Sequence, residues 1–254
     1  MAVRMNGNAS ANPRRALFVM LFLLTSNHDV ETNPKCWDEP FHQLFVQNIS
    51  SHLGRKMIPY RQIRADYDRD SIVVYQAYRK DIAQPTIKAG RFVEPFSWGR
   101  MTWIKPSFLW LMARSNWGTK SGQEHILAIR IKRDGWERAL SLGVLTSFES
   151  KTHQHQSKWR SQFDNATVHI QWDPERTING KKLEHRSIQV GLSRYIIREF
   201  TDDWILDISD FTARTRKIRS LYLAGNLKRA KDQLPPERVY SVSNDVGRQL
   251  GMER

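Results

Sequence analysis

Apolar and polar residues alternate in short blocks through most of the chain, and the first clear block is Ser71–Tyr78 (SIVVYQAY). Its β-branched and aromatic residues predict a strand. The next segment, Asp81–Gly90, predicts a short helix, because glycine commonly takes the left-handed position that ends a helix. Phe108–Ala113 is apolar on every side and predicts a buried helix with Pro106 in its first turn.

The second half of the chain repeats this change between strand and helix patterns. HILAIRIKR, from His125, is apolar on both faces, which predicts a central strand. Asp134 is expected to cap a helix over GWERALSLGV, and the polar, His-rich Lys151–Gln162 is expected to form a loop. ATVHIQWD, SIQVGL and WILDISDF predict three more strands, with SRYIIREFTDD as a helix between the last two.

These elements predict an α/β or α+β fold with at least five strands. The expected organisation is a single mixed-sheet domain with flanking helices over residues 58–254, preceded by an N-terminal extension over residues 1–57.

The order of several uncommon segments identifies a family resemblance. SIVVYQAY, GRMTWIKPSFLW and SNWGTKSGQEHILAIRI follow one another, and RSIQVGL, WILDISDFT and LPPERVY come later. Together they resemble the domain of unknown function 4291 family, from Ile58 to the C-terminus. The resemblance implies no activity, so function must be inferred from the residues themselves.

The N-terminal extension has a pattern of its own. A basic, Asn-rich start and the apolar run Ala16–Leu24 are typical of a signal peptide, although no clear cleavage site follows. Asp29–Pro34 (DVETNP) resembles the ribosome-skipping 2A-like peptides, whose motif continues with Gly-Pro. Lys35 and Cys36 replace that pair here, so we expect a decayed leader; a flexible terminus with a chance hexapeptide is the alternative.

Charge and cysteine content narrow the class of protein. The chain of 254 residues has 40 Lys and Arg against 26 Asp and Glu, a net charge of +14. This balance favours RNA, DNA or nucleotide phosphates as partners, with a solvated basic surface as the alternative.

Cys36 is the one cysteine, which excludes an intrachain disulfide. Its scarcity favours a cytoplasmic protein, or a secreted one if residues 1–26 act as a signal peptide. His153 and His155 form an HxH pair without further ligands, so no metal site is expected.

The segment from Arg100 to Ser107 combines cations with polar side chains. Pro106 disfavours the helical conformation for Lys105, which should therefore be extended just before a helix. Cations oppose a helix dipole at that end unless an anion shares the site. We therefore expect a phosphate or carboxylate to bind there, with Lys105 paired to an acidic side chain as the alternative. The predicted ligand-binding residues of this segment are Arg100, Thr102, Trp103, Lys105 and Ser107.

The first strand carries a second resemblance. Tyr75, Gln76 and Tyr78, followed by a helix and Gly90, resemble the opening of ADP-ribosyltransferase-like domains, which implies NAD as a cofactor. In those domains a His or Arg stands at the position of Gln76, and a catalytic Glu at the position of Gln189. The resemblance therefore makes Gln76 and Gln189 candidate catalytic residues, and Tyr75 and Tyr78 candidate ligand contacts. Ordinary strand packing of the tyrosines is the alternative.

Two further segments supply candidate residues. In WGTKSGQE, Glu124 is a candidate general base and Lys120 and Gln123 are candidate ligand contacts; stabilisation of the turn is the alternative. Arg214, Arg216, Lys217 and Arg219 are candidate nucleic-acid contacts, or one solvated helix face.

The leading hypothesis is a nucleotide- or RNA-phosphate-binding cleft, with an ADP-ribosyltransferase-like enzyme as its specific form. Its rival is a non-catalytic RNA- or DNA-binding module.

Overall fold

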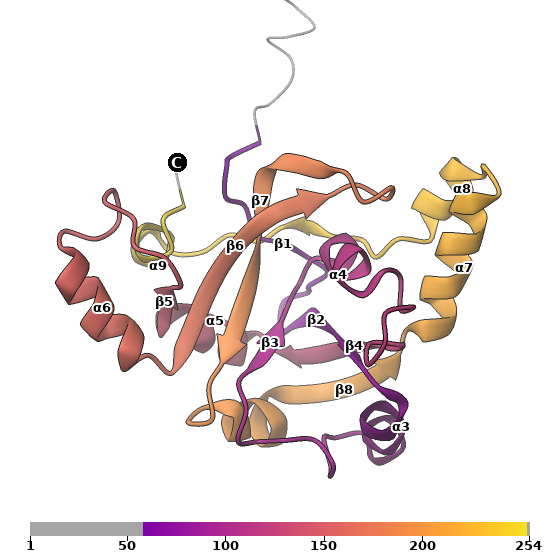
Figure 1. The fold of residues 1–254 in the computed structure, drawn as a ribbon, viewed down its shortest axis with the longest axis horizontal. Coiled ribbons are helices and arrows are strands. Elements are labelled where there is room, and N and C mark those ends of the chain that lie inside the picture. The colour runs from indigo at the N-terminus through magenta and orange to yellow at the C-terminus, as the bar shows by residue number, and fades with distance from the viewer. Residues whose placement is uncertain (1–57, 253–254) are drawn as a thin grey trace, which may run out of the picture. The chain divides into compact units, whose positions relative to one another are not determined.

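Two β-sheets, in which most neighbouring strands are antiparallel, form the centre of the fold (Figure 1). The computed structural model describes residues 58–252, which lie in one compact unit, Met57–Arg254. The 2A-like or signal-like leader lies outside the described residues. The helices and strands are β1 Arg64–Ala65, β2 Ser71–Tyr78, α3 Lys80–Ala89, β3 Thr102–Ile104, α4 Phe108–Ser115, β4 His125–Lys132, α5 Arg133–Ser141, β5 Gly143–Leu145, α6 Gln156–Asp164, β6 Val168–Arg176, β7 Lys182–Leu192, the π-helical η1 Glu199–Trp204, β8 Ile205–Asp210, α7 Thr212–Leu223, α8 Leu227–Asp232, β9 Arg238–Val239 and α9 Asn244–Gln249.

The first sheet has the order β2-β4-β8, with all pairs antiparallel. The central position predicted for the strand from His125 is confirmed. One face of β4 contributes Leu127 and Ile129 to the larger core cluster, which also holds residues of the second sheet. The other face contributes Ile126 and Ala128 to a smaller cluster beneath α4 and α7. Burial on both faces explains why this strand has no polar alternation.

The second sheet has the order β3-β7-β6-β5. β5 runs parallel to β6, and the other pairs are antiparallel. The long β6–β7 hairpin crosses the front of the molecule in Figure 1. The predicted mixed fold is therefore confirmed as α+β, with three sheets when the β1–β9 pair is included.

One backbone bridge joins the two main sheets at the place where the sequence concentrates its cations. Tyr75 of β2 pairs with Lys105, just after β3, and its N–H donates to the Lys105 carbonyl oxygen at 2.7 Å. Lys105 is thereby held in the extended conformation that the following proline favours.

Several helix boundaries differ from the expected ones. Ser107 is the N-cap of α4 and accepts a bond from Trp110 N, so Pro106 precedes the cap instead of opening the first turn. Asp134 lies inside the first turn of α5 and makes no capping hydrogen bond. It still lies at the positive end of the helix dipole. The segment predicted as a helix between β7 and β8 contains the π-helical turn η1.

The predicted loop from Lys151 to Gln162 is wrong in its second half, which forms α6. No residue of α6 is buried, so the apolar stripe that usually marks a helix is missing. Trp159 packs on Phe163 one turn later and donates to the Leu145 carbonyl oxygen at 2.9 Å, which ties the helix to β5.

Gly135 lets α5 lie directly against η1. A Cβ built on Gly135 would come within 2.4 Å of Trp204, and Trp204 is only 5% exposed. We expect Gly135→Ala to destabilise the protein by about 1–3 kcal/mol through overpacking. Denaturant unfolding should show a lower midpoint. Gly247→Ala in α9 is the matched control, because Gly247 also lies in a helix without a positive φ and the added Cβ would make only an ordinary contact, 3.8 Å from Val242. Equal losses in both variants would contradict the packing argument.

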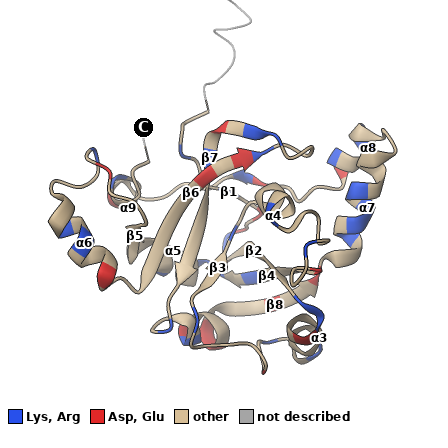
Figure 2. Ribbon diagram, viewed as in Figure 1, with Lys and Arg blue, Asp and Glu red and all other residues tan. Residues whose placement is uncertain are grey.

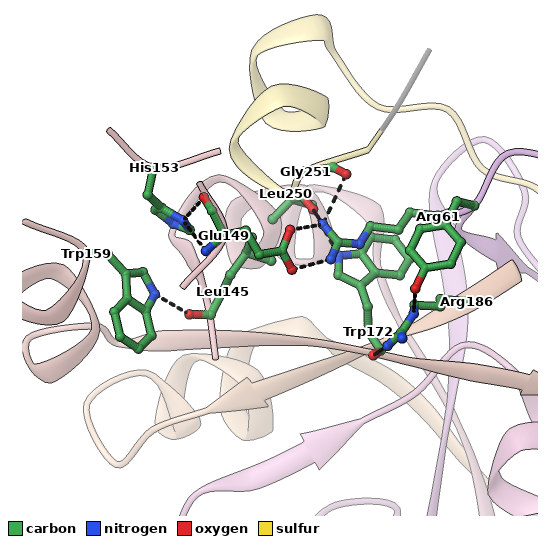
Figure 3. A network of polar contacts seen from close by, with 10 residues as sticks. Arg61, Leu145, Glu149, His153, Trp159, Trp172, Arg186, Leu250 and Gly251 are labelled. Carbon is green, nitrogen blue, oxygen red and sulfur yellow. Dashed lines mark hydrogen bonds and ion pairs between the residues drawn. The ribbon is translucent and has the colours of Figure 1, made fainter. Parts of the chain in front are cut away.

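A buried arginine connects the start of the described chain to its end (Figure 3). Arg61 forms an ion pair with Glu149 and donates to the Gly251 carbonyl oxygen at 3.1 Å. Trp172 on β6 donates to the neighbouring Leu250 carbonyl oxygen at 3.0 Å. Because these groups are remote in sequence, the network fastens the C-terminal segment to the second sheet.

Within residues 58–252, none of the helices has the length and apolar character needed to cross a membrane.

Candidate functional site

A cavity of about 700 Å³ opens beside the bridge between the two sheets. β2 and β3 contribute to its wall together with α4, β6 and β7. Most of the residues predicted to contact a ligand come together here, although they lie on segments far apart in the sequence. The predicted residues that line the cavity are Gln76, Tyr78, Arg100, Thr102, Trp103, Lys105, Gln123 and Gln189.

Lys105 is buried in this wall, with 8% of the residue exposed. Its Nζ lies 5.2 Å from the centre of the Trp110 ring and 3.4 Å from the Trp103 carbonyl oxygen. Among residues 58–252 it forms no ion pair with a carboxylate, which was the alternative interpretation of this lysine. The pKa of Lys105 is lowered to about 7, chiefly by burial and also by the Arg114 charge, while the Asp173 charge acts in the opposite direction.

Two arginines extend the positive charge of the cavity. Arg100 and Arg114 are exposed, both line the cavity, and neither makes an ion pair with the described residues. Arg114 comes from the last turn of α4. With Lys105, they place three basic side chains around one cavity.

The β2 side of the cavity is neutral and polar. Gln76 donates from Nε2 to Thr102 Oγ1 at 2.6 Å and to the Trp103 carbonyl oxygen at 3.1 Å. Its Oε1 is buried and has no hydrogen-bond partner within the described part of the chain. The Tyr78 hydroxyl lies 3.2 Å from the Thr102 hydroxyl. Burial raises the pKa of the Tyr78 phenol. An unpaired buried acceptor costs about 1–3 kcal/mol, so it marks a place where a donor would be favoured.

The opposite side holds one carboxylate. Asp173 on β6 accepts from Gln171 Nε2 at 3.0 Å through Oδ1, and it also accepts from Gln189 Nε2 through Oδ2. Gln171 and Gln189 are paired across β6 and β7, so the hairpin fixes both amides. All three residues line the cavity.

Trp103 reaches the cavity because its neighbour on β7 has no side chain. A Cβ on Gly191 would lie 2.9 Å from the Trp103 ring and 2.9 Å from the sulfur of Met101. Gly191 therefore allows both side chains to lie across β7 at the cavity rim.

The N-terminus of α4 is occupied by the protein's own carboxylates. Ser107 is 1% exposed and donates to Glu175 Oε1 at 2.9 Å, while Phe108 N donates to Glu237 Oε1 at 2.7 Å. Burial raises the pKa of Glu237 to about 8; the Phe108 N–H lowers it, and the nearby Glu175 charge raises it. Ser107 and the helix N–H groups are thus committed to internal contacts, and Ser107 does not line the cavity.

Three other predicted residues lie outside the cavity lining. Tyr75 is 1% exposed and packs edge-to-face on Phe108, as an ordinary core residue. Glu124 accepts from Gly122 N at 2.8 Å, which is the turn-stabilising alternative. Lys120 is exposed in the same turn.

The sequence interpretation missed Trp110, Arg114, Gln171 and Asp173. Gln171 and Asp173 are two residues apart in ATVHIQWD, so they share one face of β6. That polar face, opposite the buried Ile170 and Trp172, was the available signal.

The basic run falls on α7 and α8, where Figure 2 shows clustered blue segments. Arg214 donates to the Gln233 carbonyl oxygen at 3.0 Å, and Arg219 to that of Asn116 at 3.4 Å. Arg216 and Lys217 are exposed and form no ion pair with residues 58–252.

Comparison with known proteins identifies a family but no activity. Residues 62–240 match the model of the family described as "Domain of unknown function (DUF4291)". No match is found among curated proteins. The matched range contains the whole lining of the cavity. Because it covers more than half of the sequence, the chain belongs to the DUF4291 family.

Proposed function

We propose that the protein binds a phosphate-bearing ligand, such as a nucleotide or the phosphate of an RNA, in the cavity around Lys105. The observation that carries the proposal is a buried lysine without a carboxylate partner in the described chain, in a cavity that also exposes Arg100 and Arg114. An unpaired cation in a buried place is unfavourable by itself. A bound phosphate would supply the missing charge and form charge-assisted hydrogen bonds.

The specific enzymatic form of this proposal is an ADP-ribosyltransferase-like protein that uses NAD. Gln76 of β2 and Gln189 of β7, the two positions that the resemblance relates to the dinucleotide site, line the same cavity. Their side chains are amides, and the nearest acidic group is Asp173, which accepts from Gln189. NAD is therefore included among the ligands to be tested.

A thermal-shift screen tests the proposal. ADP, NAD, ATP, GTP, pyrophosphate and a short RNA are compared with adenosine, which lacks phosphate. A ligand at about 100 times its Kd should stabilise the fold by about 2.7 kcal/mol. We expect stabilisation by at least one phosphate-bearing compound and none by adenosine; equal behaviour of all compounds would contradict the proposal.

The basic α7 surface supports a second candidate function, nucleic-acid binding, because Arg216 and Lys217 are exposed and form no ion pair with residues 58–252. If this surface binds RNA, replacing Arg216, Lys217 and Arg219 by Ala should flatten the slope of log affinity against log salt. The expected change is roughly 0.7–0.9 per lost phosphate contact. Filter binding at several salt concentrations measures it, with Lys105→Met as the matched cavity variant. A slope unchanged by the triple substitution would remove α7 from the interface.

A further inference from the structure

We infer that the ligand of the cavity carries a sugar hydroxyl as well as a phosphate, and that Asp173 accepts a hydrogen bond from this hydroxyl. The inference rests on the proposed function, since it concerns the same cavity. It narrows the ligand from any polyanion to a phosphorylated sugar or a nucleotide.

The first argument is the hydrogen bonding of the carboxylate. Asp173 Oδ2 accepts from Gln189 and, at 3.3 Å, from Gln171; Oδ1 accepts from Gln171 alone at 3.0 Å. A carboxylate oxygen has two acceptor positions, so one position on Oδ1 remains. The two amides orient the carboxylate without neutralising it, and no described cation forms an ion pair with it.

The second argument is electrostatic. Lys105, Arg100 and Arg114 attract a phosphate to this cavity, whereas the negative charge of Asp173 repels it. In a cavity for phosphate alone, the carboxylate would favour the protonated form of Lys105 but would repel the phosphate itself. Its presence is accounted for if another part of the same ligand donates a hydrogen bond to it.

The third argument comes from the β2 side of the same cavity. Gln76 is 4% exposed, and its Oε1 has no partner in the described chain. Gln76 is a lining residue of the cavity, so an acceptor without a donor lies buried in the cavity wall. Hydroxyl groups are donors suited to such acceptors, while a fully ionised phosphate has none to offer.

The experiment compares ADP with 2′,3′-dideoxy-ADP, which has the same phosphates and base but lacks the ribose hydroxyls. Pyrophosphate is titrated as a ligand without a sugar. We expect wild-type protein to bind ADP about tenfold more tightly than dideoxy-ADP, in the range of one charge-assisted hydrogen bond. In Asp173→Asn the preference should fall to about threefold or less, since a neutral amide is a weaker acceptor. Dideoxy-ADP should bind the variant as well as the wild type or better, because the repelling charge is gone.

Each contrary result has a distinct meaning. Equal affinity of wild-type protein for the two nucleotides would overturn the hydroxyl inference and leave phosphate binding intact. An ADP preference that persists unchanged in a folded Asp173→Asn variant would show that Asp173 is not the acceptor. Binding of none of the three ligands would overturn this inference, whereas the proposed function is overturned only if no phosphate-bearing compound of the thermal-shift screen stabilises the protein either.

Discussion

Glu237→Gln should make the protein more stable at pH 8 and nearly unchanged at pH 5. Burial raises the pKa of this carboxyl from 4.5 to about 8. Between these values the folded protein keeps the proton and the unfolded chain releases it, so wild-type stability falls as pH rises through this window. One group contributes a slope of up to about 1.4 kcal/mol per pH unit. Glutamine keeps an acceptor for the Phe108 N–H and removes the titration.

Denaturant unfolding of both proteins at several values from pH 5 to pH 8 measures this difference. Glu184→Gln, at an exposed position of β7, is the matched control for replacing a glutamate by glutamine. A Glu237→Gln variant that is less stable than wild type at pH 8 would show that the ionised carboxylate is needed at the start of α4.

Lys105→Met should abolish most phosphate binding without loss of stability. Burial lowers the pKa of Lys105 from 10.5 to about 7. Below pH 10.5 the unfolded chain binds this proton more tightly than the folded protein does, so the lysine lowers the free energy of unfolding. Methionine fills a similar volume and removes this cost. Loss of one charge-assisted contact should weaken ADP binding about ten- to a hundredfold.

Unfolding midpoints and ADP titrations of wild-type protein, Lys105→Met and the exposed Lys120→Met measure the two effects separately. If Lys105 instead neutralised a buried carboxylate, its replacement would cost about 3–5 kcal/mol. Such a loss, with ADP affinity unchanged, would make Lys105 a structural residue.

The strands that hold the core were predictable because local pattern and burial agree in them. β2 has the predicted bounds, and β4 is apolar on both faces because it is central. Gly90 ends α3 with φ of 64°, as expected of a C-terminal glycine. By contrast, α6 buries no residue, and β5 has only three residues that follow directly on α5, so neither has a pattern of its own.

Those residues of the site whose position depends on neighbouring residues in the sequence could be predicted. Pro106 correctly indicated an extended Lys105, and the Arg100–Lys105 segment lines the cavity. The hydrogen bond from Ser107 to Glu175 could not be predicted, because Glu175 is 68 residues away in sequence and belongs to β6. The alternation in β6 places Asp173 on a polar face, but its contact with Gln189 depends on the β6–β7 register, which only the assembled sheet reveals.

The central claim, that a protonated Lys105 holds the phosphate, is tested most directly by the pH dependence of ADP affinity. The second pKa of a phosphate is about 6, so ADP keeps its charge between pH 7.5 and pH 9.5. A bound phosphate raises the pKa of the Lys105 ammonium, so binding is coupled to uptake of a proton by this lysine. The affinity for ADP must therefore fall as pH rises. Starting from a pKa of about 7, we expect wild-type affinity to fall about threefold over this interval if binding raises the pKa by one unit, and about twentyfold if it raises the pKa by two units. Lys105→Met should bind weakly and equally at both values. ADP affinity that is the same at pH 7.5 and pH 9.5 in the wild type, or a decrease that persists in Lys105→Met, would contradict the claim.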